Sequence, residues 1–139
     1  MGSTGSIGRQ TLEVIEHFPR RFKVEGLAAA RNLEVLEEQV RRFRPRAVAL
    51  AEPGAAAVLR SRLDGVKTEV YAGTGGLERL ASMGTADIVV AAVVGTAGLL
   101  PTVRAVEAGK TVALANKETL VTAGSIVSEK ARATGATLL

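Results

Sequence analysis

The chain opens with Gly2-Ser3-Thr4-Gly5-Ser6-Ile7-Gly8, which leads directly into a helical pattern that runs from Ile7 to Phe18. Glycines allow tight turns and close approach to a ligand, and a helix N-terminus offers free N–H groups to an anion such as a diphosphate. Gly8 is expected to let this helix pack closely on a sheet. The spacing G-x-x-G-x-x-G differs from the commonest dinucleotide-binding loop, G-x-G-x-x-G, so the loop alone is a weak signal. A glycine turn without a ligand remains the alternative at this point.

Beyond this loop, two kinds of segment alternate along the chain. Short apolar runs rich in Val, Leu and Ala lack a polar face, which is typical of strands buried in a parallel sheet. They cover Phe22–Ala29, Ala47–Ala51, Thr68–Tyr71, Asp87–Val94, Thr111–Leu114 and Ala136–Leu139. Between them, apolar residues recur at spacings of three and four, which is typical of amphipathic helices. These patterns predict helices at Ile7–Phe18, Leu33–Phe43 with Asn32 as its N-cap, from Pro53 onward, Leu77–Met83, Leu99–Ala108 and Thr119–Ala133.

The alternation of strand and helix predicts βαβ units in a single domain that covers residues 1–139. We expect an α/β fold with a doubly wound, mostly parallel sheet of the Rossmann-like dinucleotide-binding type, whose ligands bind at the carboxyl ends of the strands. A glycine loop of this kind normally follows a strand, yet only Met1 precedes Gly2. We therefore expect the fold to lack its central first strand, and the natural chain to carry about six more apolar residues upstream.

Composition argues against several classes of function. The chain has no cysteine, which excludes disulfides and thiolate metal sites and fits a reducing cytoplasm. Aromatic residues make up only 3%, which argues against platforms that stack nucleic-acid bases. The net charge of +4 is spread along the chain, apart from arginines that flank Pro45 at a helix end and favour the negative end of its dipole. The most apolar run, Ile88 to Val94, is far shorter than the about 20 residues of a membrane-spanning helix, and no secretory signal is visible. We predict a cytoplasmic domain that binds neither nucleic acid nor a membrane.

The residues after the second strand indicate which cofactor binds. NAD sites normally carry an acidic residue about 20 positions after the glycine loop, where it binds the ribose 2′-hydroxyl. Here the strand leads into Ala30-Arg31-Asn32 instead. Arginine suits a 2′-phosphate because its guanidinium offers paired N–H donors, whereas a cation beside a helix start is disfavoured by the dipole. The sequence therefore favours NADPH over NADH, and a solvated surface arginine is the alternative.

A second polar cluster follows the strand at Thr111–Leu114. The stretch from Ala115 continues with Asn116, Lys117 and Glu118, so a buried strand delivers consecutive polar groups at its carboxyl end. Glu118 and Thr119 could simply begin and cap the next helix. A second glycine loop, Gly95-Thr96-Ala97-Gly98, is expected to lie close by.

Four blocks together resemble the N-terminal NADPH-binding domain of the 1-deoxy-D-xylulose 5-phosphate reductoisomerase family. The blocks are GSTGSIG at 2–8, ARN at 30–32, VVGTAGLLPT at 93–102 and ANKETLV at 115–121, and they stand in the family's order. The resemblance implies a cofactor site in which Thr4, Gly5, Ser6 and Ile7 hold the diphosphate and Ala30, Arg31 and Asn32 bind the 2′-phosphate. The family commonly has Gly-Lys-Asn at 30–32, so this chain keeps the cation but not the glycine. Asn116 and Glu118 are similar to contacts near the nicotinamide, and Lys117 to a residue that hydrogen-bonds the substrate.

The resemblance also implies a reaction. The family rearranges 1-deoxy-D-xylulose 5-phosphate and reduces the product with NADPH to 2-C-methyl-D-erythritol 4-phosphate, in isoprenoid biosynthesis. It uses a divalent metal ion, Mg, Mn or Co, whose ligands are expected beyond Leu139, so no metal site and no complete catalytic set is expected in residues 1–139. The implied assembly is a homodimer, formed largely by later regions. We expect these residues alone to be inactive.

Two other interpretations remain at the level of sequence. A non-catalytic NADP-binding module is one, since no complete catalytic set is present. Another NADPH-dependent reductase is the second. Within that group, a short-chain dehydrogenase would need Tyr-x-x-x-Lys, but the single tyrosine, Tyr71, is followed by Gly75 at that spacing.

Overall fold

The computed structural model describes residues 1–93, 95–115 and 117–139, except for the side chains of residues 117–120, 122 and 123. Helices and strands alternate along these residues, as the sequence pattern predicts. The helices are α1 (Ser6–His17), α2 (Leu33–Phe43), α3 (Pro53–Arg62), α4 (Gly73–Ala81), α5 (Leu99–Glu107) and α6 (Lys117–Thr134), with a short 3-10 helix η1 (Thr96–Gly98). The strands are β1 (Gly26–Ala29), β2 (Ala47–Leu50), β3 (Glu69–Ala72), β4 (Ile88–Ala91), β5 (Thr111–Leu114) and β6 (Thr137–Leu138).

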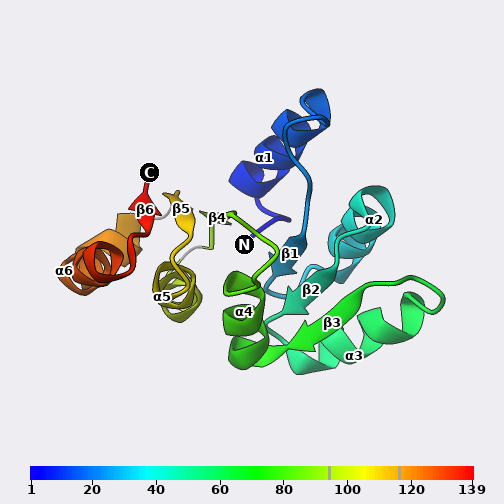
Figure 1. The fold of residues 1–139 in the computed structure, drawn as a ribbon. Helices are drawn as coiled ribbons and strands as arrows, with labels where there is room; N and C mark the ends of the chain where they lie inside the picture. Colours follow the sequence, from blue (N-terminus) through cyan, green and yellow to red (C-terminus); the bar gives the residue numbers. More distant parts are fainter. Residues whose placement is uncertain (94, 116) are drawn as a thin grey trace.

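The strands form two three-stranded sheets in which every pair is parallel. One sheet has the order β1-β2-β3, with Leu27 opposite Val48, and the other has the order β4-β5-β6, with Val89 opposite Val112. The two sheets lie on either side of the N-terminus, with β1 and β4 nearest to it (Figure 1). Within each sheet the strands therefore point the same way, and their carboxyl ends share one edge of that sheet.

The first three residues join the two sheets. The Met1 ammonium donates to the Val90 carbonyl at 2.7 Å, and the Ala92 N–H donates to the Met1 carbonyl at 3.0 Å, which is the bonding pattern of a parallel ladder. On the other side, the next two backbone N–H groups both donate to the Ala28 carbonyl of β1, at 2.8 and 2.9 Å. The order across the molecule is thus β3-β2-β1, Met1–Ser3, β4-β5-β6.

Helices cover both faces of β1 and β2 and pack on β4 and β5. One core cluster packs α1, α2 and α3 on one face of β1 and β2. The opposite face presents the short side chains of Ala28, Ala47 and Ala49, and α4 packs against them through Leu77 and Leu80. A further cluster packs α5 and α6 on β4 and β5. The predicted doubly wound α/β fold with a parallel sheet is confirmed.

Several local predictions are confirmed. Helix α2 and strand β5 have the predicted bounds, and the Asn32 side chain caps α2 by accepting a hydrogen bond from the Val35 N–H at 3.3 Å. Arg41 and Arg42 form ion pairs with nearby glutamates, which fits the structural role expected for this basic cluster. Among the described residues, no helix combines the length and apolarity needed to cross a membrane.

Most other boundaries differ slightly from the predictions, and the starts of two elements differ by four residues. Strand β1 begins at Gly26 rather than Phe22, because residues 22–25 are not paired in a strand ladder, although their alternation of apolar and charged side chains resembles that of a strand. Helix α4 begins at Gly73 rather than Leu77, because three glycines in its first turn conceal the helical pattern. One of them is needed for packing, since a Cβ on Gly76 would lie only 2.9 Å from the Cβ of Tyr71.

Candidate functional site

The candidate site is the edge at the carboxyl ends of β1, β4 and β5, which is where open parallel sheets bind ligands. The glycine loop, residues Gly2–Gly8, begins between β1 and β4 and leads into α1 (Figure 1). Arg31 follows β1, the second glycine loop follows β4, and α6 begins just after β5. The predicted blocks are therefore brought to one edge of the molecule.

Two glycines allow the loop to fit between the strands. Gly2 has a φ of +77°, and a Cβ there would lie 2.5 Å from the Ala92 carbonyl oxygen of the segment after β4. A Cβ on Gly8 would lie 2.5 Å from the Cα of Ser3 and still closer to the carbonyl oxygen of Gly2. The close contact of Gly8 is thus with the backbone of the loop itself, which adjoins the sheet. Any larger side chain at either position would push α1 or the loop away.

The N-terminus of α1 presents unpaired donors. Gly5 is the N-cap residue, and none of the described side chains caps this helix. Within the described residues, the N–H groups of Ser6, Ile7 and Gly8 have no hydrogen-bond acceptor, whereas the Arg9 N–H donates to the Gly5 carbonyl at 2.9 Å. Gly5, Ser6 and Ile7 are exposed. Together with the positive end of the helix dipole, these donors suit an anion such as a diphosphate.

Arg31 lies exposed at the end of β1, on the strand to which the glycine loop is bonded. In the part of the chain that the structure describes, its guanidinium has no ion-pair or hydrogen-bond partner. Asn32 uses its side-chain oxygen to cap α2, which leaves its amide N–H groups available as donors. Ala30 is exposed beside them. This short segment therefore offers a free cation and a donor one strand away from the loop.

The other side of the loop faces the ends of β4 and β5. The Ala115 N–H donates to the Ala91 carbonyl at 3.0 Å, so the end of β5 lies beside the end of β4. Parallel strands are about 4.8 Å apart, which puts the segment after β5 about 10 Å from Met1. Asn116 lies outside the described residues, as do the side chains of Lys117 and Glu118, whose backbone forms the start of α6.

Two residues that the sequence analysis did not single out contact the glycine loop. The Arg9 side chain donates from Nε to the Thr4 carbonyl at 3.0 Å. The Gln39 side chain, buried on α2, donates from Nε2 to the Ser3 carbonyl at 2.9 Å. The signal for Gln39 was present in the sequence, because a polar residue three positions after Leu36 falls on the apolar stripe of the helix.

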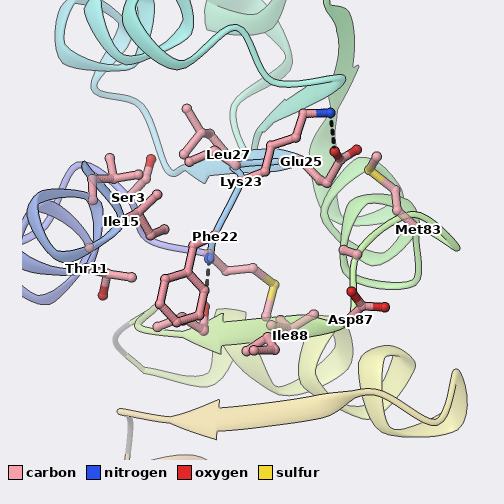
Figure 2. Close-up of a pocket in the computed structure, with 18 of the residues that line it drawn as sticks. Ser3, Thr11, Ile15, Phe22, Lys23, Glu25, Leu27, Met83, Asp87 and Ile88 are labelled. Atoms are coloured by element: carbon pink, nitrogen blue, oxygen red, sulfur yellow. Dashed lines mark hydrogen bonds and ion pairs between the residues drawn. The ribbon is translucent and has the colours of Figure 1, made fainter. Parts of the chain in front are cut away.

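A cavity of about 520 Å³ lies elsewhere, between β1 and β4 on the amino-terminal side of Met1. Figure 2 shows Ile15, Phe22 and Ile88 around this gap. Its lining is mainly apolar, and it does not include Arg31, so we do not assign it to the cofactor. Met1 is one of the lining residues, and burial of its ammonium lowers the pKa of that group to about 6.

Acidic and histidine side chains form no cluster of three or more that could hold a metal ion among the described residues. His17 is exposed, and its Nδ1 lies 2.8 Å from the Glu13 carbonyl oxygen one turn earlier on α1. We therefore assign no metal ligand to the described part of the chain.

Comparisons with known proteins agree with this geometry. The profile of the 1-deoxy-D-xylulose 5-phosphate reductoisomerase family matches residues 1–124. A 1-deoxy-D-xylulose 5-phosphate reductoisomerase of Glaesserella parasuis is 50% identical over all of this chain and 36% of its own length. The enzyme of that name from Pelotomaculum thermopropionicum is 53% identical, again over all of this chain and 36% of its own length.

Solved structures give the same result. The 1-deoxy-D-xylulose 5-phosphate reductoisomerase of Zymomonas mobilis in complex with NADPH superimposes with a TM-score of 0.94 at 43% identity, covering 99% of this chain and 36% of its own. A DOX-P reductoisomerase in complex with NADPH, fosmidomycin and magnesium superimposes with a TM-score of 0.96 at 39% identity, covering 99% of this chain and 34% of its own. The chain thus spans about a third of the length of the relatives it matches.

Proposed function

Because the chain belongs to the 1-deoxy-D-xylulose 5-phosphate reductoisomerase family, we propose that it is the NADPH-binding part of such an enzyme. The complete enzyme would convert 1-deoxy-D-xylulose 5-phosphate to 2-C-methyl-D-erythritol 4-phosphate. The single observation that carries the proposal is the shared edge at which the glycine loop, the free Arg31 and the ends of β4 and β5 meet. These groups lie on neighbouring strands, and an extended dinucleotide would contact them in succession.

We assign successive residues of this edge to successive parts of NADPH. The unpaired N–H groups at the start of α1 would bind the diphosphate, with Thr4, Gly5, Ser6 and Ile7 around it. Arg31 and Asn32, one strand to one side, would bind the 2′-phosphate with charge-assisted hydrogen bonds, beside Ala30. The absence of an acidic residue in this segment favours the phosphorylated cofactor, because a carboxylate there would repel the dianion.

The nicotinamide would lie on the other side, toward the ends of β4 and β5. We propose that Asn116 and Glu118 orient it and that Lys117 donates a hydrogen bond to the sugar phosphate substrate. When bound, NADPH supplies a hydride, and the residues of this edge fix the face from which it leaves. We further propose that the divalent metal ion, Mg²⁺, Mn²⁺ or Co²⁺, is held by residues of the complete enzyme beyond Leu139. A homodimer in the cytoplasm is proposed for that enzyme.

The test of the cofactor assignment is a comparison of NADPH and NADH affinity by fluorescence titration. We expect NADPH to bind more tightly, and Arg31→Ala to remove about tenfold to a hundredfold of NADPH affinity while it changes NADH affinity little, since charged hydrogen bonds contribute roughly 1.5–3 kcal/mol each. Arg20→Ala is the matched control, because Arg20 is another exposed arginine but lies in the turn after the C-terminus of α1. Equal affinities for the two cofactors in the unmodified chain would refute the assignment.

We also propose that an apolar strand in line with Met1 fills the cavity between β1 and β4. The ladder bonds of Met1 to β4 and the apolar lining of the cavity support this. Extension of Met1 by about six alternating Val and Ile residues should raise the Tm by several degrees. A Gly-Ser extension of equal length is the control, because it also removes the terminal charge. Equal shifts for the two extensions would contradict the proposal.

A further inference from the structure

One polar side chain interrupts the apolar face of α2. The buried residues of this helix are Leu33, Leu36, Gln39 and Val40, and Gln39 is only 8% exposed. Its Nε2 donates to the carbonyl oxygen of Ser3, in the glycine loop, at 2.9 Å. Ser3 itself is 5% exposed, so this hydrogen bond joins two buried groups that are 36 positions apart.

Both groups depend on this single bond. Within the described residues the Ser3 carbonyl accepts no other hydrogen bond, and the Gln39 Oε1 atom has no partner at all. An unpaired buried acceptor costs about 1–3 kcal/mol, so a leucine or methionine would suit this part of the core at least as well. The amide is therefore poorly explained by stability, and its one contact is with the loop.

The bond sets the direction of the loop backbone. A carbonyl oxygen that faced the site would repel a diphosphate, while N–H groups attract it. The hydrogen bond holds the Ser3 carbonyl toward α2, and Arg9 holds the Thr4 carbonyl in the same way from α1. The N–H groups of Ser6 and Ile7 are then left toward solvent.

We propose that Gln39 is a positioning residue for the diphosphate of the cofactor and acts through the Ser3 carbonyl. This inference rests on the proposed NADPH site. Gln39 lies seven positions after Asn32, or about 10 Å along the helix. Helix α2 therefore carries the 2′-phosphate segment at one end and the anchor of the diphosphate loop near the other, so it fixes their separation.

The experiment compares the unmodified chain with Gln39→Met, which has a similar shape but no amide. Each is titrated with NADPH, with NADH and with adenosine 2′-monophosphate, which has the 2′-phosphate but no diphosphate. We expect Gln39→Met to lower the affinities for NADPH and for NADH by the same factor, tenfold or more. The affinity for adenosine 2′-monophosphate should stay unchanged. The Tm should shift by only a few degrees, because the change removes one unpaired buried acceptor and creates another.

Gln39→Glu supplies a second readout. A glutamic acid donates to the Ser3 carbonyl only when it is protonated, so NADH affinity of this variant should fall as the pH rises. NADH is used because the 2′-phosphate of NADPH titrates near pH 6 by itself. The NADH affinity of the unmodified chain should not follow this profile.

The outcomes separate this inference from the proposed function. Unchanged NADPH affinity in a folded Gln39→Met chain, or a flat pH profile for Gln39→Glu, would overturn the role of Gln39 while the NADPH site stands. An equal loss of adenosine 2′-monophosphate affinity would also overturn it, since α2 as a whole would then be displaced. Failure of the unmodified, folded chain to bind NADPH would overturn both.

Discussion

Replacement of Gly8 by alanine tests the close contact between α1 and the glycine loop. A Cβ at this position would lie 2.5 Å from the Ser3 Cα and 2.8 Å from the Ser3 carbonyl carbon. Ordinary contacts of this kind are near 3.5 Å, so the helix and the loop must separate by about 1 Å. Both partners are backbone, so no side chain can rotate away to relieve the clash. The alanine therefore moves the donors at the start of α1.

Two opposing effects determine the magnitude. Alanine is a better helix former than glycine by about 1 kcal/mol. Overpacking in a well-packed region costs about 1–3 kcal/mol, and a clash with backbone belongs at the upper end of that range. We therefore expect a net loss of about 1–2 kcal/mol in the free energy of unfolding, measured by urea titration. A shift of these donors by about 1 Å would also stretch a hydrogen bond of about 2.9 Å between them and the diphosphate beyond its useful range. NADPH affinity should therefore fall at least tenfold.

Two further glycines serve as controls. Gly75 lies in α4, and a Cβ there would have no atom within 4 Å, so Gly75→Ala should stabilise the chain by up to about 1 kcal/mol. Gly5 has a φ of −78°, and its Cβ would lie 3.5 Å from the Gly2 carbonyl oxygen, so Gly5→Ala should be tolerated. If Gly8→Ala behaved like Gly75→Ala in unfolding and kept full NADPH affinity, the packing argument would be refuted.

Three other predictions concern buried polar groups. Burial lowers the pKa of the Met1 ammonium to about 6, so the unfolded chain binds more protons than the folded chain between pH 6 and 8. The free energy of unfolding should therefore rise by about 2–3 kcal/mol across that interval. Acetylation of this amine should abolish the rise, and a persisting rise would exclude Met1 as its source. Thr102 is fully buried and its hydroxyl has no hydrogen-bond partner among the described residues, so Thr102→Val should keep or raise the Tm; a large loss of Tm would contradict this. The Lys110 ammonium donates to the carbonyls of Met83 and Ala86, so Lys110→Met should cost at least about 2 kcal/mol in urea unfolding, more than any effect of an exposed lysine such as Lys67.

Periodicity was sufficient to predict most of the fold. Buried strands without a polar face and helices with apolar stripes predicted the α/β class, and α2 and β5 were predicted with their observed bounds. Where glycine replaces the apolar residues of a helix turn, as at Gly73, periodicity disappears and the prediction starts too late. Where an alternating segment has no neighbouring strand, as at Phe22, the pattern alone predicts a strand that is not formed.

The candidate site was predictable in part. Arg31 and the glycine loop could be found because their residue types break the surrounding pattern. The hydrogen bond that anchors the loop could not be found from the sequence, because the contact between Gln39 and Ser3 joins distant positions and depends on how α2 packs. Helix spacing shows that Gln39 faces inward, but only the structure shows what it meets there.

The bonds that tie Met1 to β4 have a consequence for the order of folding during synthesis. Their partners, Val90 and Ala92, are about ninety positions later in the chain. At a translation rate of about 5–20 residues per second, several seconds pass between the emergence of the two. During that interval the nascent loop can bond only to β1, because β4 has not yet been synthesised. The residues of the glycine loop are thus among the last to reach their final hydrogen bonds, although they are synthesised long before β4.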